Sequence, residues 1–565
     1  MKKNIVNKLL SLSVQGSHRT RSYGKLLSGL LSLSVAFCLT GCKDYLTEIE
    51  PGTTLLEDFY TSTPALVQNV TACYTPLMWE YNRTYCAEWF IGDVASDDAL
   101  KGGGSTNDMA DAYDIENWRT TDQNTLLLDF YRGNFMGVGR CNLAIEYIEK
   151  TQLGIDSAFN QQMKDRLLGE AHFLRAYYYF RLVRVFAGVP MPLQVVKSSE
   201  DWGMPRSSVD EVYNQILKDL TIAQKNLWLK SQYDADDMGR ATKGAAEAML
   251  MKVNLYMASP FWQEKGVKKA PADCYTDAKA WGDSIIASGE YALCLNYEDN
   301  FTLAGENGLE SVFEVQYAEV PWGDYGDGND PTKFGYTAGS FTQILVRSRN
   351  SEIGGGWGFN HPTQSLYNEF EAGDPRRDVA ILIPSTSIVP SYQEQTDEKY
   401  LGNNMVNNKY GMYRDPSDIG GGYGKWSLHA SRGPLNNKQI RYADVLLMYA
   451  EACLGLDDAG TAKGYIDQVR DRVGLAPCAV ADDATLRHER RCELAMEGHR
   501  WFDLVRWKGV AGTGLKAHMD AYKAAESEEV QHHIQEFVAG KHELFPIPQE
   551  ERQLNPTYME QNPGY

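Results

Sequence analysis

After residue 42, this 565-residue chain has no uncharged apolar run near the ~18 residues that mark a membrane-spanning helix. It also lacks an excess of positive charge, because 75 Asp and Glu residues outnumber 55 Lys and Arg residues and give a formal net charge of -20. An acidic surface repels phosphate backbones, so we expect no binding to nucleic acid. Since 43% of the residues are hydrophobic, the part after residue 42 is able to bury a large core and is predicted to be a soluble body.

Catalytic signatures are missing as well. There is no HExxH or GxSxG motif, no Walker lysine loop and no dinucleotide-binding GxGxxG, and the ten histidines show no metal-ligand spacing. The acidic stretch Asp324–Asp330 lacks the terminal Glu of an EF-hand, whose twelfth position is Gly335 here. We therefore expect a protein that is not an enzyme and has no cofactor, with a structural calcium ion as the single candidate ion.

The ten cysteines form no CxxC pair and are scattered along the chain. A chain of this size does not depend on disulfides, and their pairing does not follow from the sequence. Cys141 and Cys453 lie in helical patterns, which indicates small buried hydrophobic residues.

The N-terminal segment has the features of an export signal. Its basic residues precede the mostly apolar run Leu26–Leu39, which is too short to span a bilayer, and Gly41 and Cys42 follow. A cysteine directly after the small residue is typical of a bacterial lipoprotein signal, in which the thiol is lipidated before cleavage. We therefore expect residues 1–41 to be a signal peptide and Cys42 to carry the lipid. An ordinary signal peptide with an incidental cysteine is the alternative.

Helical periodicity dominates most of the remaining sequence. Apolar residues recur at three- and four-residue intervals, and capping residues mark several starts, such as Ser208 before Glu211. The patterns predict helices over 63–78, 142–150, 161–186, 209–227, 241–258, 363–371, 442–454, 462–473 and 485–507. Successive helix pairs with small residues at close approaches resemble stacked tetratricopeptide repeats without a strict 34-residue period. The predicted fold is mainly α, with these helix pairs packed against a loop-rich remainder that contains little strand.

The stretch 299–438 is different. It is rich in Gly, Asn, Asp, Tyr and Trp and has only short helical patterns. Loops this long are usually functional or disordered, and the aromatic content argues against disorder. We expect an N-terminal region over 42–298 and a C-terminal region over 299–565 that holds ligand-binding loops and the final helices.

Short motifs along the whole chain resemble the SusD/RagB family of outer-membrane lipoproteins from the Bacteroidetes. The motifs that carry the resemblance are Cys42–Leu46, Asp58–Tyr60, Gly92–Ala99, Glu170–Phe180, Gly188–Pro190, Gly356–Asn360, Asp374–Asp378, Arg441–Ala452, Glu497–Trp507, Pro546–Pro548 and Gln561–Tyr565. Each motif is weak alone, and their order is specific. The resemblance implies four tetratricopeptide-like helix units and a lipid anchor in the outer membrane, facing the cell exterior. It also implies a partner, a SusC-like TonB-dependent barrel that the protein closes as a lid.

Sugar binding needs flat apolar faces beside amides or carboxylates. The loop Gln316–Asp330 offers Tyr317, Trp322 and Tyr325 among acidic residues, and it is the main candidate for a ligand platform. Family analogy adds the stretch 93–118, with Asp97, Tyr113 and Trp118 as further candidates. The alternative for each of these residues is packing inside the fold.

Three residue groups favour structural roles. We expect Trp79 and Trp89 to belong to the core or to face a partner, and Arg441, Glu497, Arg500 and Arg506 to form ion pairs between helices. The Asp374–Arg377 turn is predicted to hold a structural salt bridge.

The resemblance favours one function over two alternatives. The first hypothesis is a surface lipoprotein that binds an oligosaccharide and delivers it to the SusC-like transporter. The second keeps the lid but exchanges the sugar for a peptide, as a RagB-like nutrient receptor would. An exported glycoside hydrolase is third.

Overall fold

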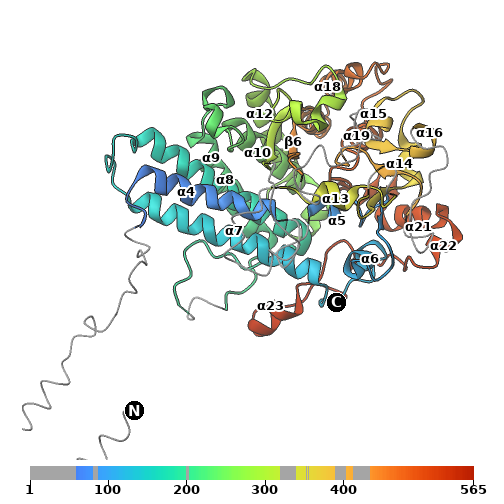
Figure 1. Cartoon of the computed structure of the whole chain (residues 1–565), viewed down its shortest axis with the longest axis horizontal. Helices are drawn as coiled ribbons and strands as arrows, with labels where there is room; N and C mark the ends of the chain where they lie inside the picture. Colours follow the sequence, from blue (N-terminus) through green and yellow to red (C-terminus); the bar gives the residue numbers. More distant parts are fainter. Residues whose placement is uncertain are drawn as a thin grey trace, which may run out of the picture. The chain divides into compact units, whose positions relative to one another are not determined.

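Long helices that pack in sequence order make the frame of the protein (Figure 1). The computed structural model describes residues 59–79, 87–198, 203–318, 339–350, 353, 355–387, 402–411 and 433–565. Residues Tyr60–Tyr565 form one structural unit. The predicted signal peptide and Cys42 lie outside the described residues, and the predicted boundary between residues 298 and 299 stays a prediction.

The long helices form pairs of neighbours. The pairs are α4 (Thr63–Tyr74) with α7 (Thr125–Lys150), α8 (Gln161–Phe186) with α9 (Val209–Asn226), α10 (Lys243–Ala258) with α12 (Pro271–Ala287), and α17 (Tyr442–Leu454) with α18 (Ala459–Arg472). Contacts between α7 and α8, α9 and α10, and α12 and α17 join each pair to the next. The predicted mainly helical fold of stacked pairs is confirmed.

Local signals in the sequence explain several helix starts. Before α9, Ser208 Oγ accepts a hydrogen bond from Glu211 N at 3.3 Å, and Glu211 Oε2 accepts one from Ser208 N at 2.8 Å. This is the predicted capping box, which satisfies two backbone donors at once. Asn160 caps α8 with a single hydrogen bond, because its Oδ1 accepts from Met163 N at 2.9 Å.

Helix α7 begins far ahead of the predicted start at residue 142. Glycines in its first half weaken the helical pattern, and one of them has a packing reason. A Cβ added at Gly137 would lie 2.4 Å from the ring of Tyr178 on α8. Glycine therefore allows α7 and α8 to approach closely, which residue propensity alone does not indicate.

The predicted helix over 485–507 was also wrong, because the structure divides it. α19 (Asp483–Glu493) and α20 (Arg500–Trp507) are separated by Met496 and Gly498, with φ values of 62° and 78°. The turn brings Gly498 against α5 (Glu88–Gly92), where a Cβ on Gly92 would lie 2.0 Å from Gly498 O. The left-handed residues of this turn prevent one continuous helix over 485–507.

Shorter elements complete the chain. The remaining α-helices are α6 (Ala110–Glu116), α11 (Pro260–Glu264), α13 (Thr342–Val346), α14 (Gln364–Glu369), α15 (Arg376–Ala380), α16 (Pro384–Ser387), α21 (Leu515–Ala525), α22 (Glu528–Gln531) and α23 (Gln549–Leu554). The 3₁₀ turns are η2 (Thr75–Met78), η4 (Lys230–Gln232), η5 (Ala235–Asp237), η6 (Tyr297–Phe301) and η7 (Leu303–Gly305).

Strands in the described part of the chain form four antiparallel pairs. They are β1 (Ala99–Gly102) with β3 (Phe359–Pro362), β2 (Ser311–Val315) with β6 (Asn437–Arg441), β4 (Ile381–Leu382) with β5 (Val406–Asn407), and β7 (Gly509–Val510) with β8 (Thr513–Gly514). In the second pair Val315 faces Asn437, so the end of β2 meets the start of β6. This junction positions the candidate site.

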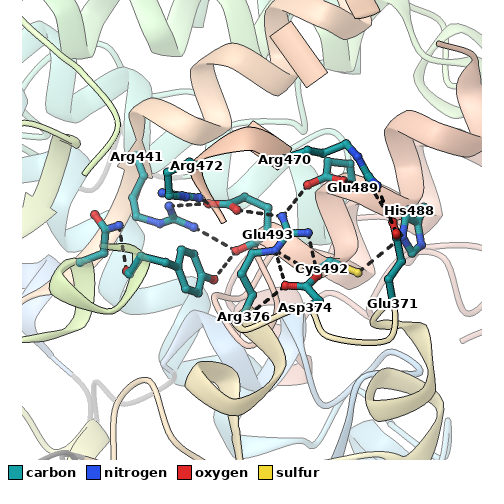
Figure 2. Close-up of polar contacts among 12 residues, drawn as sticks. Glu371, Asp374, Arg376, Arg441, Arg470, Arg472, His488, Glu489, Cys492 and Glu493 are labelled. Carbon is teal, nitrogen blue, oxygen red and sulfur yellow. Dashed lines mark hydrogen bonds and ion pairs between the residues drawn. The ribbon is translucent and has the colours of Figure 1, made fainter. Parts of the chain in front are cut away.

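A buried ion-pair cluster holds the C-terminal helices to the loops. Figure 2 shows Arg376, Arg441 and Arg472 converging on Glu493 of α19. Arg376 also pairs with Asp374 at 2.8 Å and Glu489 at 2.5 Å, and its side chain is fully buried. Arg441 adds Glu310 at 2.5 Å and Glu497 at 2.8 Å. These contacts confirm the salt bridge predicted in the Asp374–Arg377 turn and an ion pair of Arg441 with Glu497. That pair does not join two helices as predicted, because Arg441 ends β6 and Glu497 lies in the turn between α19 and α20.

Arg500 and Arg506 form ion pairs as predicted, but of the pairs named here it is Arg506 with Glu451 that joins two helices, α20 and α17. Arg500 pairs with Asp97 at 2.7 Å, and Arg506 pairs with Asp503 and Glu451. Cys141 and Cys453 are fully buried thiols, as predicted from their helical positions. None of the described helices combines the length and the apolar composition needed to cross a membrane.

Candidate functional site

A polar pocket lies where the end of β2 meets α8 and β6. It has a volume of about 60 Å³. We call it the polar pocket. The lining residues that carry its chemistry are Trp79, Glu88, Trp89, Tyr177, Arg181, Tyr317, Asn437 and Gln439.

One wall of the polar pocket is a chain of hydrogen bonds. Tyr177 Oη, on α8, donates to Gln439 Oε1 at 2.5 Å, and Gln439 Nε2 donates to Asn437 Oδ1 at 3.0 Å. Asn437 and Gln439 are alternate residues of β6, so their side chains share one face of the strand, and both are partly exposed. Amides beside a phenol supply both donors and acceptors to a polar ligand.

Tyr317 lies at the same pocket, just after β2. Its N donates to Asn436 Oδ1 at 2.7 Å, and its side chain is largely buried. Trp79 follows η2, is half-buried, and has the guanidinium of Arg140 5.1 Å from its ring centroid. The structure therefore brings one sequence-predicted candidate, Tyr317, together with Trp79, Trp89 and Tyr177 from three other segments.

Charged groups of the polar pocket are paired within the protein. Arg181 Nε lies 3.3 Å from Glu88 Oε2, and Arg184 pairs with the other oxygen of Glu88. Burial by itself raises the pKa of Glu88, but the two arginines outweigh it, so the pKa is lowered and the carboxylate stays ionised. Because these charges are compensated, a neutral polar ligand suits the pocket better than an ion.

Three buried donors at the polar pocket have no hydrogen-bond acceptor among the described residues. They are Trp89 Nε1, Asn407 Nδ2 and the hydroxyl of Tyr410. A buried polar group without a partner is costly, and bound water commonly supplies the missing bond. The pocket is therefore suited to hydrated, hydroxyl-rich ligands.

Other predicted candidates fall outside this description. Trp322 and Tyr325 lie in residues 319–338, outside the described residues, as does the acidic stretch Asp324–Asp330 with its candidate calcium ion. Their roles in ligand binding stay predictions.

Asp97 was predicted as a ligand contact, and the structure gives it a different role. Its carboxylate is fully buried and accepts from Arg500 Nε at 2.7 Å, while His518 Nε2 lies 2.8 Å away. Burial raises its pKa, but Arg491 and Arg500 dominate and hold the pKa well below the usual range. Asp97 therefore holds α20 in place, and its carboxylate is not accessible to a sugar.

Trp118 and Tyr113 are likewise interior residues. The Trp118 ring packs edge-on against Phe537 at 5.2 Å between centroids, with only 6% of the residue exposed. Tyr113 is 4% exposed, and the guanidinium of Arg119 lies 4.8 Å from its ring centroid. Both expected ligand contacts are corrected to packing, because Phe537 and Arg119 pack against these rings inside the fold.

Sequence reasoning missed Tyr177 and Gln439. Tyr177 belongs to the apolar pattern of α8, where nothing distinguishes it from its core neighbours. Gln439 sits in the five-residue strand Asn437–Arg441, in which Ile440 alone is apolar, so no alternation in the sequence marked it.

Two models of known families match the chain. A model described as "SusD family" matches residues 309–565, and one described as "Starch-binding associating with outer membrane" matches residues 44–255. The chain belongs to the SusD family. This confirms the resemblance and agrees with the expectation of a non-catalytic protein.

Relatives in the SusD family cover most of the chain. A SusD-like protein of Bacteroides ovatus is 28% identical over 490 residues, which is 85% of this chain and 82% of the relative. SusD-like protein P38 of Formosa agariphila is 28% identical over 508 residues, covering 84% and 90%.

Solved structures share the fold. A "Laminarin binding SusD-like protein" is 26% identical, with a TM-score of 0.72, and the match covers 89% of this chain and 99% of that one. Surface glycan-binding protein A from Bacteroides thetaiotaomicron in complex with laminarihexaose is 20% identical, with a TM-score of 0.69 over 88% and 99%.

Proposed function

We propose that the protein is a lipoprotein of the outer-membrane surface that captures an oligosaccharide and delivers it to a SusC-like TonB-dependent transporter. The observation that supports this most directly is the hydrogen-bonded pair of Tyr177 and Gln439 beside Trp79 and Tyr317. Aromatic rings accept the C–H faces of sugars, and amides bond their hydroxyls. The SusD family match supports the membrane location and the partner.

The size of the polar pocket constrains how a glycan would bind. A volume of about 60 Å³ does not enclose a sugar ring, so the ligand lies across the mouth and directs hydroxyls inward. We further propose that Trp322 and Tyr325, which follow Tyr317 in the sequence, contribute stacking faces. Modest affinity is sufficient, since receptor and transporter share one membrane at high effective concentration.

The test is calorimetry of the mature protein, purified from membranes in detergent, with a panel of linear hexasaccharides. The panel includes laminarihexaose, because two solved relatives are named for laminarin or its hexasaccharide. Binding of at least one member supports the proposal. No binding to any glycan, together with binding of a peptide mixture, would favour the peptide receptor instead, and new reducing ends would indicate a hydrolase.

Two variants locate the site. Gln439→Ala removes hydrogen bonds at the mouth, and we expect roughly a fivefold loss of affinity, as for one hydrogen bond of about 1 kcal/mol. Gln224→Ala is the matched control, because Gln224 is also half-buried but bonds Glu247 on α10. Trp79→Ala, with the half-buried Trp281→Ala on α12 as its control, tests the aromatic contribution. Unchanged binding in both site variants would move the site elsewhere.

A further inference from the structure

A second hollow opens beside the polar pocket, on the other side of the end of β2. It has a volume of about 220 Å³, several times that of the polar pocket. We call it the methionine pocket. Side chains from the end of α4 and η2, from η5 and the turn after it, and from β2 line it. Those that matter here are Thr75, Leu77, Met78, Asp236, Met238 and Val315.

The two pockets form one depression. Leu77 and Val315 line both of them. One residue also ties their walls together, because Asn436 Nδ2 donates to Gln316 Oε1 at 3.0 Å while Asn436 Oδ1 accepts from Tyr317 N at 2.7 Å. A ligand long enough to cross the end of β2 therefore meets both pockets in a fixed geometry.

Glycine shapes the methionine pocket. Gly239 has a φ of 92°, and a Cβ on it would lie 2.3 Å from Gln316 Cδ. Any other residue would push the turn away from β2. Gln316 cannot yield easily, since its side chain exchanges hydrogen bonds of 2.8 and 3.1 Å with Asn307. The backbone at Gly239 and the hydrogen bonds of Gln316 thus fix the shape of the methionine pocket.

The chemistry of the lining is two-sided. Leu77 and Val315 are buried in its floor, and Met238 is 41% exposed at its edge. Among the described residues, the carboxylate of Asp236 and the hydroxyl of Thr75 have no hydrogen-bond partner, and Asp236 is exposed. Arg240, by contrast, is engaged by Asp237 at 2.6 Å and by Glu170 at 3.0 Å. The lining thus offers an apolar surface and uncommitted acceptors at the rim.

We propose that the methionine pocket is a second saccharide subsite, which takes one hexose unit of the chain whose neighbouring units lie across the polar pocket. The C–H face of the ring packs on Met78 and Met238, and ring hydroxyls donate to Asp236 and Thr75. This inference rests on the proposed function and deepens it, because it makes the receptor selective for chain length.

The experiment is calorimetry of the mature protein with a trisaccharide and a hexasaccharide of the backbone that binds in the panel, laminaritriose and laminarihexaose being the first pair. We expect the hexasaccharide to bind at least tenfold more tightly than the trisaccharide. Met238→Ala and Asp236→Asn should each weaken hexasaccharide binding about fivefold and leave trisaccharide binding unchanged. Matched controls are Met204→Ala, with 40% of the residue exposed, and Asp234→Asn, an exposed neighbour outside the pocket lining.

Each result decides between the two proposals. Equal affinity for both lengths, or hexasaccharide binding that neither variant weakens, overturns the second subsite and leaves the proposed function standing. A variant that weakens both lengths equally overturns the division into two subsites. Failure of the unmodified protein to bind any glycan removes the proposed function and this inference with it. Circular dichroism melting of each variant checks that its fold is intact.

Discussion

The carboxyl of Asp93 and the side-chain amide of Asn360 face each other inside the protein, with 3.3 Å between Asp93 Oδ2 and Asn360 Nδ2. Both side chains are buried, and Asp93 Oδ1 accepts from Gly498 N at 2.9 Å. Burial and the negative charge of Asp98 raise the pKa of Asp93 to about 8, so the carboxyl holds its proton at neutral pH. When the side-chain amide of Asn360 is rotated by half a turn, its Oδ1 faces Asp93 and accepts a hydrogen bond from the protonated carboxyl. In the other orientation Asn360 Oδ1 has no partner among the described residues.

Asp93→Asn should therefore change how stability depends on pH. A raised pKa contributes stability that is fully present below the unfolded value near pH 4 and is lost as the pH rises to about 8. We expect the free energy of unfolding of the unmodified protein to fall, relative to that of the variant, between pH 4 and 8. Urea denaturation across this range measures the difference. Asp471→Asn, at an exposed position of α18, is the control and should show no such pH-dependent difference in the free energy of unfolding. Parallel curves for Asp93→Asn would show that Asp93 is ionised in the folded protein.

Arg376→Ala should destabilise the protein strongly. Removal of this fully buried guanidinium leaves Asp374, Glu489 and Glu493 without one of their cations, and breaking a buried pair costs about 3–5 kcal/mol. The neighbouring Arg377→Ala is the control. Its partner Asp378 is 75% exposed by side chain, so that loss should stay below about 1 kcal/mol. Chemical denaturation of both variants compares them, and similar losses would refute the importance assigned to the cluster in Figure 2.

Acid should weaken the same region through Glu497. Burial raises the pKa of this carboxyl, but Arg441 and Lys409 outweigh it and lower the pKa to about 2. A lowered pKa contributes stability that is present above the unfolded value near pH 4.5 and is lost as the pH falls through about 2. The urea midpoint of the unmodified protein should thus decline as the pH falls through this window. The midpoint of Glu497→Gln should start lower and decline less. Glu149→Gln, an exposed position on α7, should follow the unmodified protein. An unchanged slope in Glu497→Gln would contradict the assignment.

Cys42→Ser tests the membrane anchor. If the thiol carries the lipid, the variant should incorporate no labelled palmitate and should leave the membrane fraction, whereas Cys38→Ser, inside the signal, should remain attached. Fractionation of cells that express each full-length protein gives the result. Retention of label by Cys42→Ser would restore the alternative of an ordinary signal peptide with an incidental cysteine.

Helices with strong local signals were predictable, and those shaped by contacts were not. The capping box at Ser208 and the apolar spacing of 161–186 specify α9 and α8 because both signals act within one turn. The first half of α7 and the break between α19 and α20 were missed. Both depend on glycines that meet other segments, Gly137 against Tyr178 and Gly498 against Gly92, and no local pattern reveals such contacts.

In the candidate site, too, some residues were predictable from local sequence and others depended on distant contacts. Tyr317 was predicted because an aromatic face beside acidic residues suits a sugar, and it lines the polar pocket. Asp97 and Trp118 had equally suitable chemistry, but Arg500 and Phe537 bury them from distant parts of the chain. Tyr177 joins the pocket because β6 places Gln439 beside it, 262 residues later.

The amino-acid order by itself determined the family, the predicted lipid anchor and most of the helices. The family motifs, the N-terminal signal and the helical spacing can each be recognised from residues that are close together in the sequence. Only the tertiary structure decided which aromatic and acidic residues line a pocket and which are buried. Long-range strand pairing and buried charge pairs set the exposure of each side chain, and exposure depends on neighbours that are distant in sequence.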